Sequence, residues 1–256
     1  MAPNKVMTIG QAMQRVQSGS RLMLGEFVGA GEPAKCIEWL LEHDVGDLTL
    51  ICNTPGLNGF GKALLYKKGA VRELIATHVG TTVESTEAYL AGRLAAKQFF
   101  PMGTWAEKVR AGGVGLGGVL VPVGVGILDE AGLFPDLAEP KQKVRLNGRE
   151  YFIEEALTAD VSIIKGWRAD PLGNVEFRFM AAQNQKDLAM AGDFTIAEVN
   201  EIVPVGTIPP ERVGCPGPFV DAVVQGESLE EQHERYRRHW IKLGRLRAPE
   251  PAAKAV

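Results

Sequence analysis

Residues 110–126 of this 256-residue chain constrain its fold most, because seven of them are glycines that alternate with small apolar residues and one proline. Glycine loses more backbone entropy on ordering than any other residue, so such a run is unfavourable for a helix or a strand. We expect a set of tight turns in which the main chain itself forms a surface. The N–H groups of such a surface can hold an anionic or enolate oxygen. A tightly packed crossover between two layers is the alternative interpretation.

The composition limits the class of protein. With 45% hydrophobic residues the chain can bury a sizeable core, and we expect one domain over residues 1–248 followed by a disordered tail over 249–256. A formal net charge of −3 argues against a nucleic-acid partner. No segment resembles a signal peptide or approaches the ~20 apolar residues of a membrane helix, so we expect no membrane partner.

The cysteines and histidines give no sign of a metal site. Cys36, Cys52 and Cys215 stand far apart, no Cys-x-x-Cys pair occurs, and the four histidines have no metal-ligand spacing. We therefore expect no structural zinc, no disulfide framework and a reducing, cytoplasmic location.

The first half of the chain alternates expected helices with expected strands. Apolar periodicity and capping residues predict helices over 8–16, 34–42, 84–91 and 104–110. Short apolar runs predict strands over 21–24, 48–52, 71–77 and 95–100. This alternation is typical of an α/β fold with an open, mostly parallel sheet and helices on both faces.

The second half follows a different pattern. Asn147-Gly148 predicts a hairpin over residues 143–153. Further buried strands are expected over 159–164 and 195–199, and a charged amphipathic C-terminal helix over 227–243.

Ligands of open α/β sheets bind beyond the carboxyl ends of the strands. Three segments occupy such positions here: 25–33, 53–61 and 101–104. The chain has no phosphate-binding G-x-x-x-x-G-K-[ST] motif and no G-x-S-x-G nucleophile elbow. The glycines of the first segment do not have dinucleotide-binding spacing.

A series of ordered motifs runs through most of the chain. In chain order they are Gly25-x-Phe27-x-Gly29-x-Gly31-x-Pro33, Asp47-Leu48-Thr49-Leu50-Ile51-x-Asn53, His78-Val79-Gly80-Thr81, Pro101-Met102-Gly103-Thr104-x-x-Glu107, Arg110-Ala111-Gly112-Gly113, Val121-Pro122-Val123-Gly124, Arg168-Ala169-Asp170-x-x-Gly173-Asn174 and Cys215-Pro216-Gly217-x-Phe219-Val220-Asp221. Together they resemble the A (alpha) subunit of family I coenzyme A transferases of the acetoacetate/butyrate/3-oxoacid type.

The resemblance implies a CoA-transferase/NagB-like fold and a partner B (beta) subunit, commonly in an α₂β₂ assembly. It implies short-chain acyl-CoA substrates, branched or dicarboxylic ones included, with coenzyme A as part of the substrate and no permanently bound cofactor. In that family the covalent nucleophile is a glutamate in a Ser-Glu-Asn-Gly motif of the B subunit. That motif is absent here, so we expect this chain to be inactive alone.

The resemblance also implies a set of substrate-binding positions. They are Gly25, Phe27, Gly29, Gly31, Asn53, Met102, Gly103, Gly112, Gly113, Val121 and Val123.

Several of these positions depart from the family pattern. Glu26 stands where the family usually has a glycine, and Met102 stands where it usually has a glutamine. The two threonines of the usual Thr-Pro-Thr-Gly are replaced by Val121 and Val123. The usual Ala-Arg-Asn-Phe-Asn is replaced by Ala181-Ala182-Gln183-Asn184-Gln185. Glu26 is the candidate catalytic group, as a proton donor or substrate orienter; a solvated loop carboxylate is the alternative.

Three functions stay open at this point. One is CoA transfer with a more apolar acyl substrate. Another is an acyl-CoA decarboxylase of the glutaconyl type, or a hydrolase, because an apolar pocket favours loss of a carboxylate. The third is a noncatalytic binding subunit.

Overall fold

A computed structural model describes residues 4–129 and 141–248. The predicted tail over 249–256 lies outside these residues. Within them an eight-stranded sheet has the order β11-β10-β8-β1-β2-β3-β4, with β9 added beside β8. Neighbouring strands are parallel, except for the β8–β9 pair. The strands are β1 Arg21–Leu24, β2 Leu48–Cys52, β3 Val71–Ala76, β4 Ala95–Phe99, β8 Ala159–Ala169, β9 Val175–Glu176, β10 Gly192–Ile202 and β11 Ala222–Gln225.

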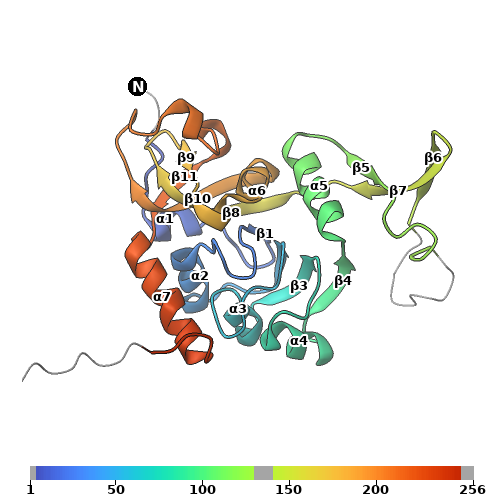
Figure 1. Ribbon diagram of the computed structural model, residues 1–256, viewed down its shortest axis with the longest axis horizontal. Helices are drawn as coiled ribbons and strands as arrows, with labels where there is room; N and C mark the ends of the chain where they lie inside the picture. The colour runs from blue at the N-terminus through green and yellow to red at the C-terminus, as the bar shows by residue number, and fades with distance from the viewer. Residues whose placement is uncertain (1–3, 130–140, 249–256) are drawn as a thin grey trace, which may run out of the picture.

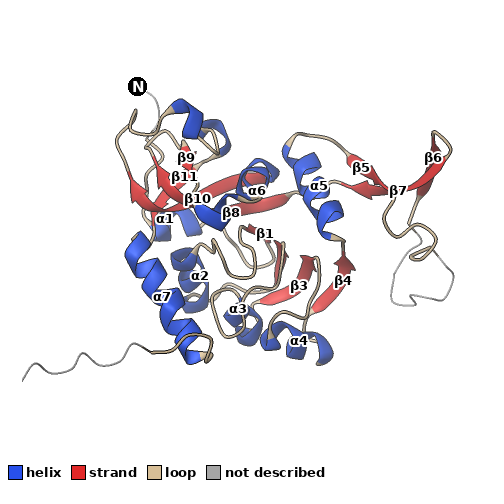
Figure 2. Ribbon diagram, in the orientation of Figure 1, coloured by secondary structure: helices blue, strands red, loops and turns tan. Residues whose placement is uncertain are grey.

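Helices cover both faces of this sheet (Figure 1, Figure 2). They are α1 Ile9–Met13, α2 Ala34–Glu42, α3 Ala63–Lys68, α4 Val83–Leu90, α5 Met102–Gly113, α6 Gln185–Ala191 and α7 Leu229–Lys242. Successive residues of a strand point to opposite faces, and the core divides accordingly. Leu22 and Leu24 pack in the cluster that includes α1 to α4, whereas Met23 packs in the cluster that includes α5 and α6. The predicted α/β class with helices on both faces is confirmed.

Most predicted elements are present, with ends that differ by a few residues. Strands 21–24 and 48–52 and helix 34–42 have the predicted bounds, and Thr8 caps α1 in a capping box. Helix α5 begins two residues earlier than predicted and extends to Gly113. Helices α3 and α6 were not predicted.

Only part of the glycine run forms the predicted turns: residues 114–115 and 123–126 lie in turns, with positive φ at Gly115, Gly124 and Gly126. Residues 110–113 complete α5, and residues 118–121 form the strand β5 (Gly118–Val121). A Cβ at Gly112 would lie 2.0 Å from the carbonyl oxygen of Leu157, and one at Gly113 would lie 2.7 Å from Cβ of Met190. The alternative interpretation, a tightly packed crossover, therefore describes these two glycines, because only glycine allows α5 to approach its neighbours so closely.

A second, three-stranded antiparallel sheet projects beside the main body, as Figure 1 shows at the right. Its order is β5-β7-β6, with β6 Lys143–Leu146 and β7 Arg149–Glu155. The predicted Asn147-Gly148 hairpin is confirmed, with φ of 50° and 79° at these two residues.

Candidate functional site

The ends of the three neighbouring strands β2, β3 and β4 meet at the carboxyl edge of the main sheet. Asn53 follows β2, and its carbonyl oxygen accepts hydrogen bonds from the Thr77 amide and hydroxyl, which follow β3. Asn53 Nδ2 lies 3.0 Å from Met102 Sδ, which belongs to the first turn of α5 after β4. The sequence-predicted residues Asn53 and Met102 are thus brought together. Asn53 Oδ1 has no hydrogen-bond partner among the described residues, and Met102 is 40% exposed.

Gly103 lies beside Met102 at the beginning of the 12-residue helix α5. The first amides of a helix have no acceptor in a preceding turn, and the helix dipole favours negative charge there. This end of α5 can therefore stabilise an oxygen that becomes negatively charged, such as that of a thioester under attack.

The segment 25–33, which we call the glycine loop, follows β1 and borders the same edge. Phe27 and Ala30 exchange two backbone hydrogen bonds of 2.9 Å around Val28 and Gly29, whose φ angles are 49° and 82°. A positive φ is unusual for a β-branched residue and marks a strained tip. The Val28 side chain is 37% exposed, so an apolar group of the tip faces outward.

The Glu26 side chain is fully buried, which contradicts the alternative of a solvated loop carboxylate. Its Oε2 accepts a 2.8 Å hydrogen bond from the Gly29 amide, and its Oε1 accepts from the Thr54 amide at 3.1 Å and the Thr54 hydroxyl at 2.9 Å. Lys62 Nζ lies 2.5 Å from the same Oε1. These are donors that favour a carboxylate. Because no part of the side chain is exposed, the geometry favours an orienting role for Glu26 over direct proton transfer to a substrate.

Two further ionisable side chains share this buried region. Burial raises the pKa of Glu32 to about 8, with Lys62 opposing that rise. Burial alone would lower the pKa of Lys62, but the nearby Cys52, Glu26 and Glu32 outweigh it and hold that pKa above its ordinary value. At neutral pH the cluster therefore holds a Lys62–Glu26 ion pair beside a protonated Glu32.

Two glutamines hold the backbone of the glycine loop from the other side. Gln183 Nε2 donates to the carbonyl oxygen of Glu26 at 2.7 Å, and Gln185 Nε2 donates to that of Gly31 at 3.3 Å. A Cβ at Gly25 would lie 1.9 Å from Gln185 Oε1, so a side chain at that position would displace the Gln185 amide. The sequence marked both glutamines as departures from the family pattern but did not assign them this role.

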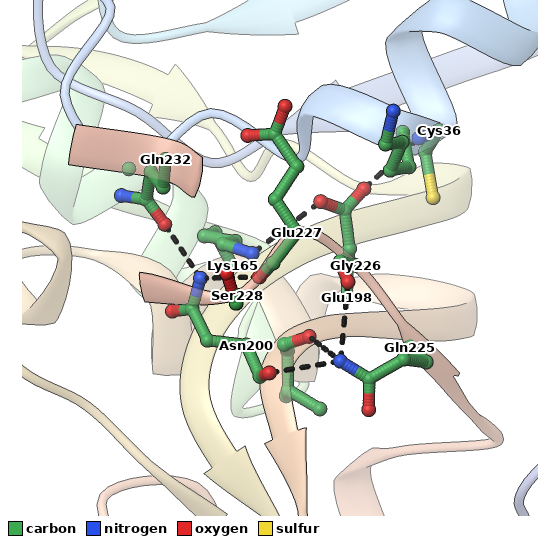
Figure 3. A network of polar contacts seen from close by, with 12 residues as sticks. Cys36, Lys165, Glu198, Asn200, Gln225, Gly226, Glu227, Ser228 and Gln232 are labelled. Carbon is green, nitrogen blue, oxygen red and sulfur yellow. Dashed lines mark hydrogen bonds and ion pairs between the residues drawn. The ribbon is translucent and has the colours of Figure 1, made fainter. Parts of the chain in front are cut away.

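The glycine loop ends where α2 begins, and a buried carboxylate of β10 holds that end. Glu198 Oε2 accepts a 2.9 Å hydrogen bond from the Cys36 amide in the first turn of α2, and Glu198 Oε1 lies 3.4 Å from Lys165 Nζ. Figure 3 shows Glu198 between Cys36 and Lys165. A negative charge here complements the helix dipole, which fixes the end of the loop.

In the same view, Asn200 fastens the beginning of α7. Its Nδ2 donates to the Glu227 carbonyl and to Gln232 Oε1, both at 2.7 Å (Figure 3). Further along α7, the Tyr236 hydroxyl donates to the carbonyl oxygen of Gly29. Helix α7 thus reaches the tip of the glycine loop.

Four predicted substrate-binding residues lie elsewhere. Gly112 and Gly113 are at the opposite end of α5 from Met102, which at 1.5 Å per residue is about 16 Å away. Val121 is buried in β5 of the projecting sheet, and Val123 follows it with 51% exposure. Gly112 and Gly113 therefore lie away from the carboxyl edge of the main sheet, and the two valines belong to the projecting sheet and the turn that follows it.

Metal sites and membrane-spanning helices are both absent from the described residues. Among them, no group of three or more histidine, cysteine or acidic side chains is arranged to hold a metal ion. None of the helices in residues 4–129 and 141–248 has the length and apolar character needed to cross a membrane.

The family model described as "Coenzyme A transferase" matches residues 6–226. The "Probable coenzyme A transferase subunit alpha" of Bacillus subtilis is 41% identical over 231 residues, covering 90% of this chain and 97% of that protein. The mitochondrial "Succinyl-CoA:3-ketoacid coenzyme A transferase 2A" of Mus musculus is 36% identical over 235 residues, but these cover 88% of this chain and only 45% of that longer protein.

Solved structures show a similar fold at lower identity. The glutaconate coenzyme A-transferase of Acidaminococcus fermentans superimposes with a TM-score of 0.72 at 21% identity, over 93% of this chain and 88% of that one. A single-substitution variant of a protein described as "the decarboxylase AibA/AibB" gives the same TM-score and identity over 96% of both chains.

Proposed function

We propose that this chain, which belongs to the coenzyme A transferase family as an alpha-type subunit, forms the acyl-binding side of an active site whose nucleophile lies on a B subunit. The observation that carries the proposal is the arrangement at the carboxyl edge. Asn53, Met102 and the first turn of α5 offer an amide, a thioether and free helix amides. The adjoining side chains that can act as nucleophiles, Glu26 and Cys52, are fully buried.

The chemistry of this edge supports a small, largely apolar acyl group. Burial raises the pKa of Cys52 to about 12, so its thiol stays protonated and unreactive. Exposed apolar atoms of Val28 and Met102 border the edge. The proposed reaction moves coenzyme A from a short-chain acyl thioester to a carboxylic acid. Coenzyme A is then part of the substrate.

The projecting sheet supports a partner subunit. On one of its faces, Leu120 and Ile153 are paired across β5 and β7, and they are 43% and 42% exposed; Leu146 of β6 is 50% exposed. A sheet face of this kind is typical of a protein–protein interface. Since the mouse relative continues over a further half that this chain does not match, we propose that a B subunit covers this face, in an α₂β₂ assembly. A reducing cytoplasm remains the predicted compartment, because Cys36, Cys52 and Cys215 are unpaired and buried.

Co-purification and an activity assay test this function. The chain is expressed alone and together with a B subunit, and acetoacetyl-CoA formation is measured from acetoacetate with acetyl-CoA or succinyl-CoA. We expect turnover from the complex only. Turnover by the chain alone would refute the proposal.

Decarboxylation of an acyl-CoA is the second candidate, favoured by the exposed thioether of Met102 where the family usually has a glutamine. An apolar side chain there suits a departing carboxylate, and the beginning of α5 suits the enolate that remains. Release of CO₂ from a glutaconyl-type thioester by the complex, without CoA transfer, would favour this candidate.

A further inference from the structure

A buried charged cluster lies beneath the glycine loop, made of Glu26, Glu32 and Lys62. These side chains are 0%, 1% and 0% exposed. Glu26 follows β1, Glu32 precedes α2, and Lys62 directly precedes α3, so three separate chain connections converge there. Burying three ionisable groups is costly unless their charges and hydrogen bonds are matched. Such a cluster at a candidate site therefore calls for a functional reason.

Glu26 joins the two segments that carry the candidate site. Its carboxylate accepts from the Gly29 amide at the tip of the glycine loop and from the amide and hydroxyl of Thr54. Thr54 is the neighbour of Asn53, and its hydroxyl also accepts from the Val28 amide at 3.0 Å. The position of Asn53 relative to the loop tip therefore depends on one carboxylate.

Lys62 is the cation that faces this carboxylate. The other groups facing Glu26 are Cys52 of β2, Tyr66 of α3, Tyr236 of α7 and Glu32, all uncharged at neutral pH because burial raises their pKa values. Arg235 of α7 acts on Glu32 and forms its own 2.9 Å ion pair with Glu227. Without Lys62, the Glu26 charge would lack its closest compensating cation.

We propose that Lys62 is a positioning residue for the acyl-binding edge, by which we mean Asn53, Met102 and the first turn of α5 at the carboxyl edge of the main sheet. Its ammonium group pairs with the buried carboxylate of Glu26, and that carboxylate fixes the Gly29 amide and the Thr54 backbone beside Asn53. The effect on catalysis rests on the proposed function, whereas the effect on the loop concerns this chain alone.

Hydrogen exchange in the full chain tests the effect on the loop. In Lys62→Met, we expect amides in peptides over 25–33 and 53–61 to exchange roughly tenfold faster or more, because a buried charge-assisted contact is lost. The double variant Glu26→Gln/Lys62→Met removes both charges and should regain most of the protection at neutral pH.

Lys108→Met is the matched control. Lys108 is also buried and lies 2.9 Å from a carboxylate, that of Glu154, but it contacts the projecting sheet. This variant should lower thermal stability without changing exchange over 25–33 and 53–61. Wild-type exchange in Lys62→Met, or equal loss of protection in the control, would overturn the proposal. If Lys62→Met does not fold, the double variant decides: folding with a protected loop supports the proposal, and failure to fold overturns it.

Kinetics of the complex with a B subunit test the effect on catalysis. With acetoacetate and succinyl-CoA, Lys62→Met should lower kcat roughly tenfold or more while KM for succinyl-CoA changes little, because the loop is misplaced rather than removed. An unchanged kcat would overturn the catalytic part. A wild-type complex without CoA transfer would instead contradict the proposed function, and the exchange result would still decide the positioning role.

Discussion

The substitution Glu32→Gln should change how stability depends on pH. Glu32 is 1% exposed, and its two carboxylate oxygens have no hydrogen-bond partner among the described residues. Burial raises its pKa from the ordinary 4.5 to about 8. The folded chain therefore binds this proton more tightly than the unfolded chain does. Glutamine has nearly the size and polarity of the protonated acid and cannot release a proton.

The sign and size of the effect follow from proton linkage. Because the folded pKa is raised, the stabilisation from Glu32 protonation is fully present below pH 4.5 and is lost as the pH rises through about 8. Each pKa unit corresponds to about 1.4 kcal/mol, so the loss is on the order of 5 kcal/mol across that window. The variant lacks this loss. The free energy of unfolding of the variant should therefore increase relative to that of the wild type as the pH rises from 5 to 8.

Urea unfolding followed by tryptophan fluorescence at pH 5, 6, 7 and 8 measures this difference. The control is Glu42→Gln, which changes an exposed carboxylate at the end of α2. Its free energy of unfolding should depend on pH in the same way as that of the wild type. If the free energy of unfolding of Glu32→Gln also depends on pH in the same way as that of the wild type, Glu32 is not protonated in the folded chain. The reasoning about the buried cluster would then be wrong.

Three further predictions concern the site, the partner and the packing. Met102→Gln restores an amide at the acyl-binding edge, so the complex should keep or raise its rate of CoA transfer to acetoacetate. A fall in the rate of CO₂ release from a glutaconyl-type thioester would instead favour decarboxylation. Leu120→Asp places a charge on the apolar face of the projecting sheet, so co-purification with the B subunit should fall at least roughly tenfold, and full retention would show that the interface lies elsewhere. Gly112→Ala should cost roughly 1–3 kcal/mol by urea unfolding, because its Cβ meets the Leu157 carbonyl, whereas Gly10→Ala in α1, with nothing within 4 Å, should cost less.

Local pattern predicted the elements whose surroundings match their sequence. Helix 34–42 has an apolar stripe on one face, and strand 48–52 is buried on both sides. Periodicity and hydrophobicity therefore predict the same secondary structure that the folded chain has there. The glycine run shows the opposite case. Gly112 lies in a helix despite its low propensity, because the Leu157 carbonyl approaches α5 from a segment 45 positions away. Tertiary packing outweighs propensity there, and the local sequence contains no sign of it.

The position of Glu26 could be predicted from the sequence, but its role could not. A carboxylate in a glycine-rich segment looks solvated because nearby residues offer nothing to neutralise it. Its counter-ion, Lys62, directly precedes helix α3, which periodicity did not predict, and Thr54 lies just after the end of β2. Burial of Glu26 is therefore a property of the folded arrangement and not of the segment. Since glycine is usual at this position, the carboxylate brings a charge that the fold must compensate, and Lys62 compensates it at the point where the loop tip and Asn53 are joined. Sequence reasoning fails most often at functional sites, and this position next to the acyl-binding edge is consistent with that rule.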